Sequence, residues 1–143
     1  MLPDKILLAS DHAGIPLKTA IKKFLYGLGK PIEDLGVHTE ESVDYPDIAH
    51  YLAQKIEKGE APRGILVCGT GVGMSMAANR HPGVRAAVVT DHVSAKMSRA
   101  HNDSNVLCLG ARVVTPAVAE DLIKIWLETP FEGGRHVARI KKI

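Results

Sequence analysis

The sequence has no long apolar run, no excess of charge of one sign and only two cysteines. None of its apolar runs approaches the roughly 20 residues that a helix needs to span a bilayer. Its 18 basic and 16 acidic residues give a net charge of +2, which is too balanced to indicate binding to nucleic acid or to an anionic membrane. Any site that binds an anion must therefore be local.

The sequence also shows no secretory signal and no internal repeat. Met1–Lys5 carries a proline and charged residues ahead of one short apolar run, which is unlike a secretory signal. We therefore expect a cytoplasmic protein in which Cys68 and Cys108 remain free thiols. The 143 residues, 45% of them apolar and 24% charged, suit one globular domain over 1–143 with a tail from residue 128 onward.

Short apolar runs alternate with helix-like segments along the chain. The runs predict five strands, at Lys5–Ala9, Pro31–Leu35, Gly64–Cys68, Val84–Val89 and Val106–Leu109. Between them, apolar residues recur at helical spacing. This alternation predicts an α/β fold, a Rossmann-like three-layer αβα sandwich with a five-stranded parallel sheet and a C-terminal helical tail.

The ends of the predicted strands carry reactive side chains. Ligands of such sheets bind beyond the carboxyl ends of the strands. The residues found there are Ser10-Asp11-His12, Cys68-Gly69-Thr70, Thr90-Asp91 and Gly110-Ala111-Arg112. We therefore expect a carboxylate, an imidazole, a thiol, a hydroxyl and a guanidinium to face one crevice.

The glycine-rich stretch that starts at Cys68, Cys-Gly-Thr-Gly-Val-Gly, is the most informative motif. Alternate glycines let backbone N–H groups turn toward an anion at close range. Such a turn alone could also hold the phosphate of a nucleotide. However, no Lys follows as in a Walker loop, and neither the spacing nor the third-strand position fits a dinucleotide fingerprint. A cysteine phosphatase would place an Arg where Met74 stands.

The two thiols receive different interpretations. A cysteine that ends a strand is usually a packing residue, and this is our interpretation of Cys108. Cys68 precedes the glycine loop and a helix start, which favours the thiolate over the thiol. A thiolate that faces backbone amides could remove a proton from carbon while the amides stabilise the resulting oxyanion.

Five motifs together resemble the ribose-5-phosphate isomerase B family, in that family's order and over essentially the whole chain. They are Asp11-His12-Ala-Gly, Val43-Asp44-Tyr45-Pro46, Cys68-Gly-Thr-Gly-Val-Gly, His101-Asn102-Asp103-Ser104-Asn105 and Glu132-Gly133-Gly134-Arg135-His136. Galactose-6-phosphate isomerase subunits share the glycine loop but generally lack the His-Asn-Asp motif and the basic tail. Some relatives use a Glu at the position of Ser75 instead of the loop cysteine. The resemblance therefore implies the pentose branch and the version with a cysteine base.

The resemblance also implies an activity and its residues. The activity is interconversion of D-ribose 5-phosphate and D-ribulose 5-phosphate, a step of the pentose phosphate pathway, without a cofactor. Cys68 would carry the proton between C1 and C2, and His101 would open the ring with Asp11 and Thr70 nearby. The remaining contacts would come from backbone N–H groups of Gly69, Thr70, Gly71, Val72 and Gly73, and from Tyr45 and Asn102 at the sugar. The phosphate, or the sugar end near it, would be bound by His12, Arg112, Arg135 and Arg139.

The resemblance implies a homodimer whose active sites are shared, with the tail from 128 to 143 reaching the partner subunit; further pairing into a tetramer stays open. Arg135 and Arg139 share one face if the tail is helical, although a solvated basic terminus would have the same composition. No His-Glu or His-x-His spacing indicates a metal site. Two alternatives remain: an isomerase of a six-carbon phosphate such as allose or galactose 6-phosphate, and a non-catalytic phosphosugar-binding module.

Overall fold

A computed structural model describes residues 4–143 of the chain. The first three residues of Met1–Lys5, on which the expectation about secretion partly rests, lie outside the described residues. Among residues 4–143, no helix is both long enough and apolar enough to cross a bilayer.

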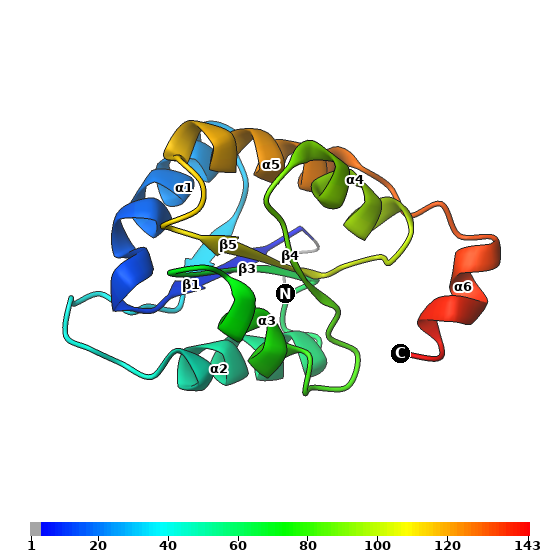
Figure 1. Cartoon of the computed structure of the whole chain (residues 1–143), viewed down its shortest axis with the longest axis horizontal. Coiled ribbons are helices and arrows are strands. Elements are labelled where there is room, and N and C mark those ends of the chain that lie inside the picture. The colour runs from blue at the N-terminus through cyan, green and yellow to red at the C-terminus, as the bar shows by residue number, and fades with distance from the viewer. Residues whose placement is uncertain (1–3) are drawn as a thin grey trace.

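The centre of the molecule is a sheet of five parallel strands (Figure 1). The strands are β1 (Ile6–Ser10), β2 (Ile32–Asp34), β3 (Arg63–Cys68), β4 (Ala86–Val88) and β5 (Val106–Gly110). Their order is β2-β1-β3-β5-β4, so the chain leaves β1 toward one edge and β3 toward the other. The predicted parallel sheet is confirmed, and its switch point lies between β1 and β3, where such sheets bind ligands.

Helices cover both faces of the sheet, as Figure 1 shows. One layer contains α1 (Ile15–Gly27), α4 (His92–Ala100) and α5 (Pro116–Glu128). The other contains α2 (Tyr45–Glu57) and α3 (Val72–Ala78). The short 3-10 helix η1 (His12–Gly14) and the tail helix α6 (Arg135–Ile140) complete the described elements. The three-layer αβα sandwich is therefore confirmed.

Alternation along the strands builds the two halves of the core. Successive side chains of a strand point to opposite faces, so Ile6 and Leu8 pack with α1 and α5 while Leu7 and Ala9 pack with α2 and α3. Trp126 of α5 is fully buried and donates from Nε1 to Ser104 Oγ at 2.8 Å. This bond satisfies the polar atom of the largest buried side chain.

Two local features differ from the prediction. The Asp11 carboxylate accepts a hydrogen bond from the Gly14 N–H at 3.0 Å and so caps η1, a turn too short to produce a periodic pattern. Helix α3 begins at Val72, so Val72 and Gly73 form its first turn rather than the end of a loop.

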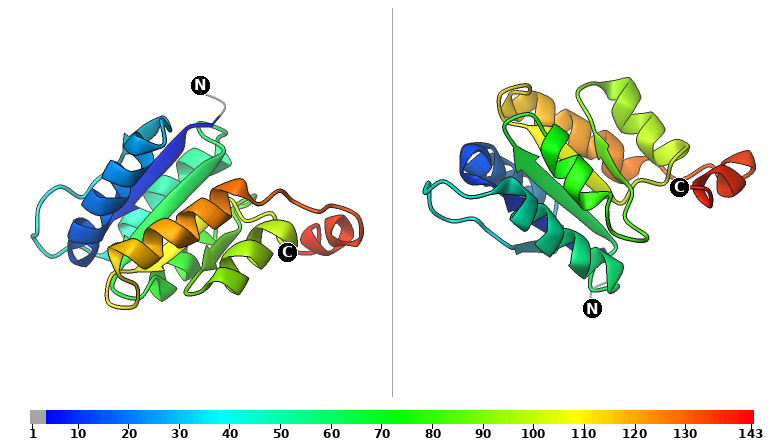
Figure 2. Two further views of the ribbon diagram at one scale, coloured as in Figure 1. Left: turned by 90° about the horizontal axis from the view of Figure 1, so that it is seen from above. Right: turned by 60° about the horizontal axis from the view of Figure 1, so that its bottom comes forward.

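The tail is helical, as predicted, and α6 stands apart from the main body next to the end of α4 (Figure 2). His136 of α6 is 5% exposed, and its ring stacks on that of His101 with 4.3 Å between the ring centroids. The tail thus lies on the side of the molecule where β5 begins, away from the carboxyl ends of the strands.

Candidate active site

A pocket of about 380 Å³ opens at the carboxyl ends of β1 and β3. Its lining residues are Asp11, Tyr45, Cys68, Gly69, Thr70, Val72, Gly73, Met76 and Arg112. All of them except Met76 are residues that the sequence assigns to the site. The carboxylate, thiol, hydroxyl and guanidinium expected at the strand ends therefore do face one crevice, whereas the expected imidazole, that of His12, is not among the lining side chains.

Cys68 ends β3 with its sulfur turned toward the glycine loop. The Sγ atom accepts a hydrogen bond from the Gly71 N–H at 3.1 Å. Gly71 reaches this position in the left-handed region, at φ 81°, which a glycine adopts without steric cost. Cys68 is 5% exposed, so the sulfur lies at the floor of the pocket, beside the Gly71 amide and largely shielded from water.

Neighbouring backbone holds the glycine loop in place. The Ala111 N–H donates to the Cys68 carbonyl at 2.8 Å, and the Arg112 N–H donates to the Gly69 carbonyl at 3.0 Å. The loop also packs closely on Gly110, where an added Cβ would come within 2.7 Å of the Thr70 backbone. These contacts use the carbonyl groups of the loop and not its N–H groups. Two of the loop N–H groups make bonds inside the loop: that of Gly71 to the Cys68 sulfur, and that of Val72 to Thr70 Oγ1 at 3.3 Å.

Two side chains form walls of the pocket. Tyr45, the first residue of α2, lies over Gly73, since a Cβ at Gly73 would be 2.3 Å from the tyrosine ring. The Arg112 guanidinium lies over Gly69, with Nη1 3.4 Å from the position of a Cβ there. The pocket thus places one fixed positive charge and one hydroxyl-bearing ring beside the thiol. Both groups can hold a polar, anionic ligand.

Cys108 is a packing residue, in agreement with the sequence interpretation. Both cysteines are free thiols, and Cys108 lies in the middle of β5, fully buried. Burial raises the pKa of the Cys108 thiol far above its ordinary value, and the nearby Cys68 raises it further. Cys108 therefore stays protonated and takes no part in acid–base chemistry.

Two other expected site residues have local roles. His12 Nδ1 accepts a hydrogen bond from the Val43 N–H at 3.2 Å, which ties the segment before α2 to η1. Asp91 does not line the pocket; it caps α4, and bonds from the Ser94 backbone and side chain lower the pKa of its carboxyl.

Four predicted site residues, His101, Asn102, Arg135 and Arg139, lie at the other edge of the sheet. Helix α4 runs from the carboxyl end of β4 back to the start of β5, so His101 at its end is at the amino edge. Within one chain, His101 therefore does not meet Asp11 and Thr70 as expected. Asn102 lines a separate cavity of about 350 Å³ that the C-terminal residue Ile143 also borders.

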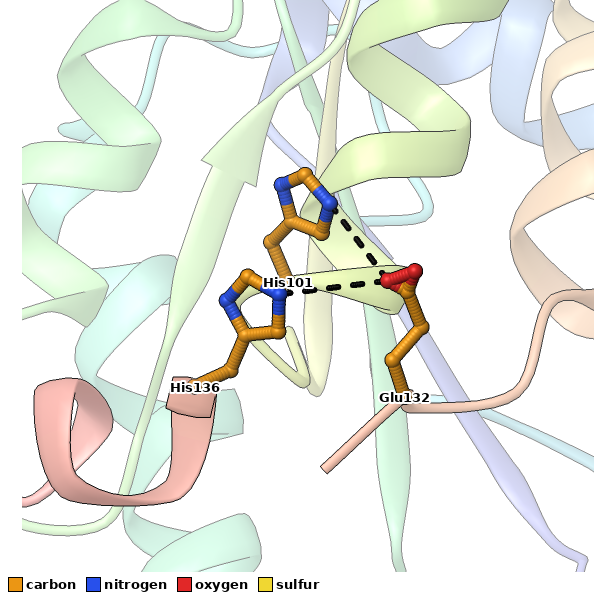
Figure 3. Close-up of side chains that lie close together, drawn as sticks. All are labelled: His101, Glu132 and His136. Carbon is orange, nitrogen blue, oxygen red and sulfur yellow. Dashed lines mark ion pairs between the residues drawn. The ribbon is translucent and has the colours of Figure 1, made fainter. Parts of the chain in front are cut away.

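His101 instead meets the tail, as Figure 3 shows. Glu132 Oε2 lies 3.5 Å from His101 Nε2 and 3.8 Å from His136 Nε2. Burial lowers the pKa of His136, and the charges of His101 and Arg135 lower it further, against the opposite effect of Glu132. His136 is therefore mainly neutral near pH 7.

The sequence interpretation missed Met76 and Glu132. Met76 lies one helical turn after Val72 and is 66% exposed at the pocket rim, so helical periodicity from Val72 could have indicated it. Glu132 precedes His136 by four residues, a spacing that brings two side chains together on a helix or a tight turn.

Comparisons with known proteins identify the family of the chain. The sequence profile of the Ribose/Galactose Isomerase family matches residues 6–143. Ribose-5-phosphate isomerase B of Escherichia coli is 44% identical over 139 residues, which are 97% of this chain and 93% of that protein. D-erythrulose-4-phosphate isomerase of Pectobacterium atrosepticum is 42% identical over 139 residues, 96% of this chain and 91% of that protein. The structure of Clostridium thermocellum ribose-5-phosphate isomerase B superposes with a TM-score of 0.95 at 50% identity and covers 96% of this chain and 93% of that one.

Proposed function

The chain belongs to the ribose/galactose isomerase family of enzymes, and on that basis we propose that it interconverts D-ribose 5-phosphate and D-ribulose 5-phosphate. The observation that carries the proposal is the position of Cys68 Sγ beside the amides of the glycine loop, 3.1 Å from the Gly71 nitrogen, on the floor of a pocket that also holds Arg112. A base and a set of oxyanion donors converge there on the space a small sugar would occupy.

The proposed chemistry is a proton transfer between two carbons. The open-chain aldose has a C1 carbonyl, and Cys68 as thiolate removes the proton from C2. The electron pair moves to O1 and forms an enediolate, which the loop N–H groups stabilise; one such donor is worth about 10²–10³ in rate in other enzymes. The thiol returns its proton to C1, the O2 hydroxyl proton passes to O1, and the ketose results. No redox partner is required.

Ring opening and phosphate binding need residues from the other edge of the sheet. Since His101, Arg135 and Arg139 of one chain lie away from its own pocket, we propose that His101 of the partner subunit opens the ring in a homodimer. Arg135 of the partner subunit and Arg139 of the partner subunit would bind the phosphate together with Arg112 and His12. Exposed apolar side chains at the pocket rim, Val72 at 44% and Met76 at 66%, support a partner surface there.

The substrate test is an assay of ketose formation from ribose 5-phosphate in chelator-treated buffer without nucleotide. We expect turnover under these conditions, with a higher kcat/KM than for allose 6-phosphate or galactose 6-phosphate. Failure of ribose 5-phosphate to react would overturn the proposal.

A four-carbon substrate is the second candidate, because the relative at 42% identity bears the name of a tetrose-phosphate isomerase. The same reaction, followed in the reverse direction with D-erythrulose 4-phosphate as the substrate, distinguishes the tetrose-phosphate activity from the pentose-phosphate activity. A higher kcat/KM for the four-carbon sugar would move the assignment from the pentose to the tetrose.

A further inference from the structure

We propose that His101, Glu132 and His136 form a binding site for a divalent transition-metal ion of the zinc type. The three side chains come from the end of α4, the segment before α6 and α6 itself (Figure 3). Their ligand atoms all lie within 4.8 Å of one another. The site lies at the edge of the sheet opposite to the Cys68 pocket of the same chain.

Two of the separations within the cluster come close to the spacing that an ion would impose on its ligands. Zinc bonds of about 2.0–2.2 Å to nitrogen and oxygen place tetrahedral ligands roughly 3.3 Å apart. The Glu132 oxygen is 3.5 Å from His101 Nε2 and 3.8 Å from His136 Nε2, slightly more than this spacing. Two imidazoles and one carboxylate are also the set that catalytic zinc sites use, with a fourth position left for water.

The bonding of His136 is a second, independent feature that points to a ligand at this cluster. Among residues 4–143, its Nε2 atom is buried and has no hydrogen-bond partner, although leaving a buried polar atom unpaired destabilises a fold. The atom points toward Glu132 (Figure 3), and the ring that carries it stacks on His101. An ion in the cluster would satisfy it.

One movement is required before all three groups share an ion. The two rings stack with 14° between their planes, so their nitrogen lone pairs run side by side and do not converge. The His136 side chain is 6% exposed and held by burial, whereas that of His101 is 36% exposed. We therefore expect the His101 ring to turn about its Cβ–Cγ bond when the ion binds.

The donor atoms of the site determine which metal ions it prefers, and the charges around it determine how tightly it binds them. Nitrogen donors favour zinc, cobalt, nickel and copper over magnesium and calcium, which prefer oxygen. Glu132 contributes one negative charge, while Arg135 and Arg139 lie close enough to influence His136 and oppose a cation. The affinity should therefore be lower than that of the same three ligands in a neutral setting.

The consequence for activity rests on the proposed function. An ion held by His101 occupies the imidazole to which ring opening is assigned, so it should inhibit isomerisation reversibly. The expected role is thus inhibition, and no step of the reaction uses the ion.

Titration calorimetry with zinc chloride on the tag-free, chelator-treated protein tests the site. We expect one saturable ion per chain and no binding of magnesium. Glu132→Gln and His136→Asn should each weaken zinc binding by at least about tenfold, since loss of even a supporting group commonly costs that much. Glu132 is 53% exposed at its side chain, so its variant should fold even if the buried His136 variant does not.

A second histidine cluster provides the matched control. His50 Nδ1 and His81 Nε2 are 2.7 Å apart, and Glu57 bonds the other nitrogen of His81 at 3.2 Å. These three groups do not face one point, so His81→Asn should bind zinc as the wild type does. Absence of saturable binding, unchanged affinity in Glu132→Gln, or an equal loss in His81→Asn would overturn the site. Binding without inhibition would leave the site in place and contradict the role of His101.

Discussion

Glycines at positions 73 and 110 shape the pocket through the side chains they lack. At Gly73 a Cβ would collide with the Tyr45 ring, and at Gly110 it would collide with the backbone of Thr70. The two collisions differ because Tyr45 is 41% exposed and its ring can swing aside, whereas Thr70 lies in a loop that bonds from the Ala111 and Arg112 N–H groups hold in place. Gly73 therefore offers a way to move one pocket wall without unfolding the protein.

Gly73→Ala should weaken substrate binding and leave stability nearly unchanged. The new methyl group displaces Tyr45 from the pocket wall, so we expect KM for ribose 5-phosphate to rise several-fold. The free energy of unfolding should change by no more than about 1 kcal/mol, as is usual for substitutions near the surface. Steady-state kinetics and urea unfolding measure the two effects.

Gly27→Ala is the control for this substitution. Gly27 lies at the end of α1, and no atom of another described residue lies within 4 Å of the position of a Cβ there. This variant should keep the wild-type KM. If Gly73→Ala also kept it, Tyr45 would have no part in binding the sugar.

Sequence reasoning reached Cys68, Asp11 and Arg112 because each follows a strand, whereas Tyr45 came only from the family resemblance. Once Cys68, Asp11 and Arg112 are placed after parallel strands, the topology brings them to one edge. Met76 was missed because its position depends on where α3 begins.

At the scale of elements, a buried ion cluster joins α1 to β2. Asp34 at the end of β2 bonds Lys18 at 2.8 Å and Lys22 at 3.2 Å, and also accepts from the Gly36 N–H. Burial by itself would raise the pKa of the Asp34 carboxyl, but the bonds from Lys18, Gly36 and Lys22 outweigh it, so the pKa lies below its ordinary value. The cluster therefore stabilises the fold while Asp34 is ionised.

Asp34→Asn should lower the free energy of unfolding at pH 7 by about 3 kcal/mol, since it leaves Lys18, with a side chain 4% exposed, without its countercharge. Because the folded pKa is the lower one, the wild type keeps this stabilisation above the unfolded value of about 4 and loses it as the pH falls further. The Asp34→Asn variant has no carboxyl to protonate at this position, so it should not show this decrease in the free energy of unfolding at acid pH. Urea unfolding between pH 7 and pH 3 measures both.

Glu33→Gln, on the same strand, is the comparison for Asp34→Asn. Its partner Lys5 is 2.6 Å away, but both side chains are partly exposed, at 25% and 38%. Such a pair contributes about 0–1 kcal/mol. An Asp34→Asn variant no less stable than Glu33→Gln would show that the cluster does not hold α1 to β2.

Periodicity predicted the elements better than their ends. The long helices and all five strands follow from apolar spacing. The missed helix η1 depends on one capping bond from Gly14 to Asp11, and the start of α3 at Val72 depends on the left-handed conformation of Gly71. Neither leaves a repeated pattern in the sequence.

At the scale of the whole molecule, the path of α4 separates His101 from Cys68. Motif order along the chain could not reveal this, because His101 is only 33 residues beyond Cys68 yet lies at the opposite edge of the sheet. The separation is the main reason for proposing a site shared between two subunits.

A heterodimer of Cys68→Ala and His101→Asn chains tests the sharing. Each homodimer should be inactive. Chains co-expressed with two different tags and purified on both should contain one intact site, built from Cys68 of one chain and His101 of the other, and recover about half of the wild-type turnover.

A doubly tagged heterodimer as inactive as its parents would place Cys68 and His101 in the same site of one chain. Co-expression of two Cys68→Ala chains with the same tags controls for contamination by wild-type enzyme.

Solvent deuterium incorporation in the Cys68→Ala variant tests the central claim most directly, namely that the thiol beside the glycine loop moves the proton. In deuterium oxide, the wild type should introduce deuterium at the carbons that exchange the proton, as mass spectrometry of the recovered sugar phosphate detects. We predict that Cys68→Ala still binds ribose 5-phosphate in titration calorimetry but introduces no deuterium above the uncatalysed rate. Deuterium incorporation by Cys68→Ala at the wild-type rate would contradict the account, because another group would then have to be the base.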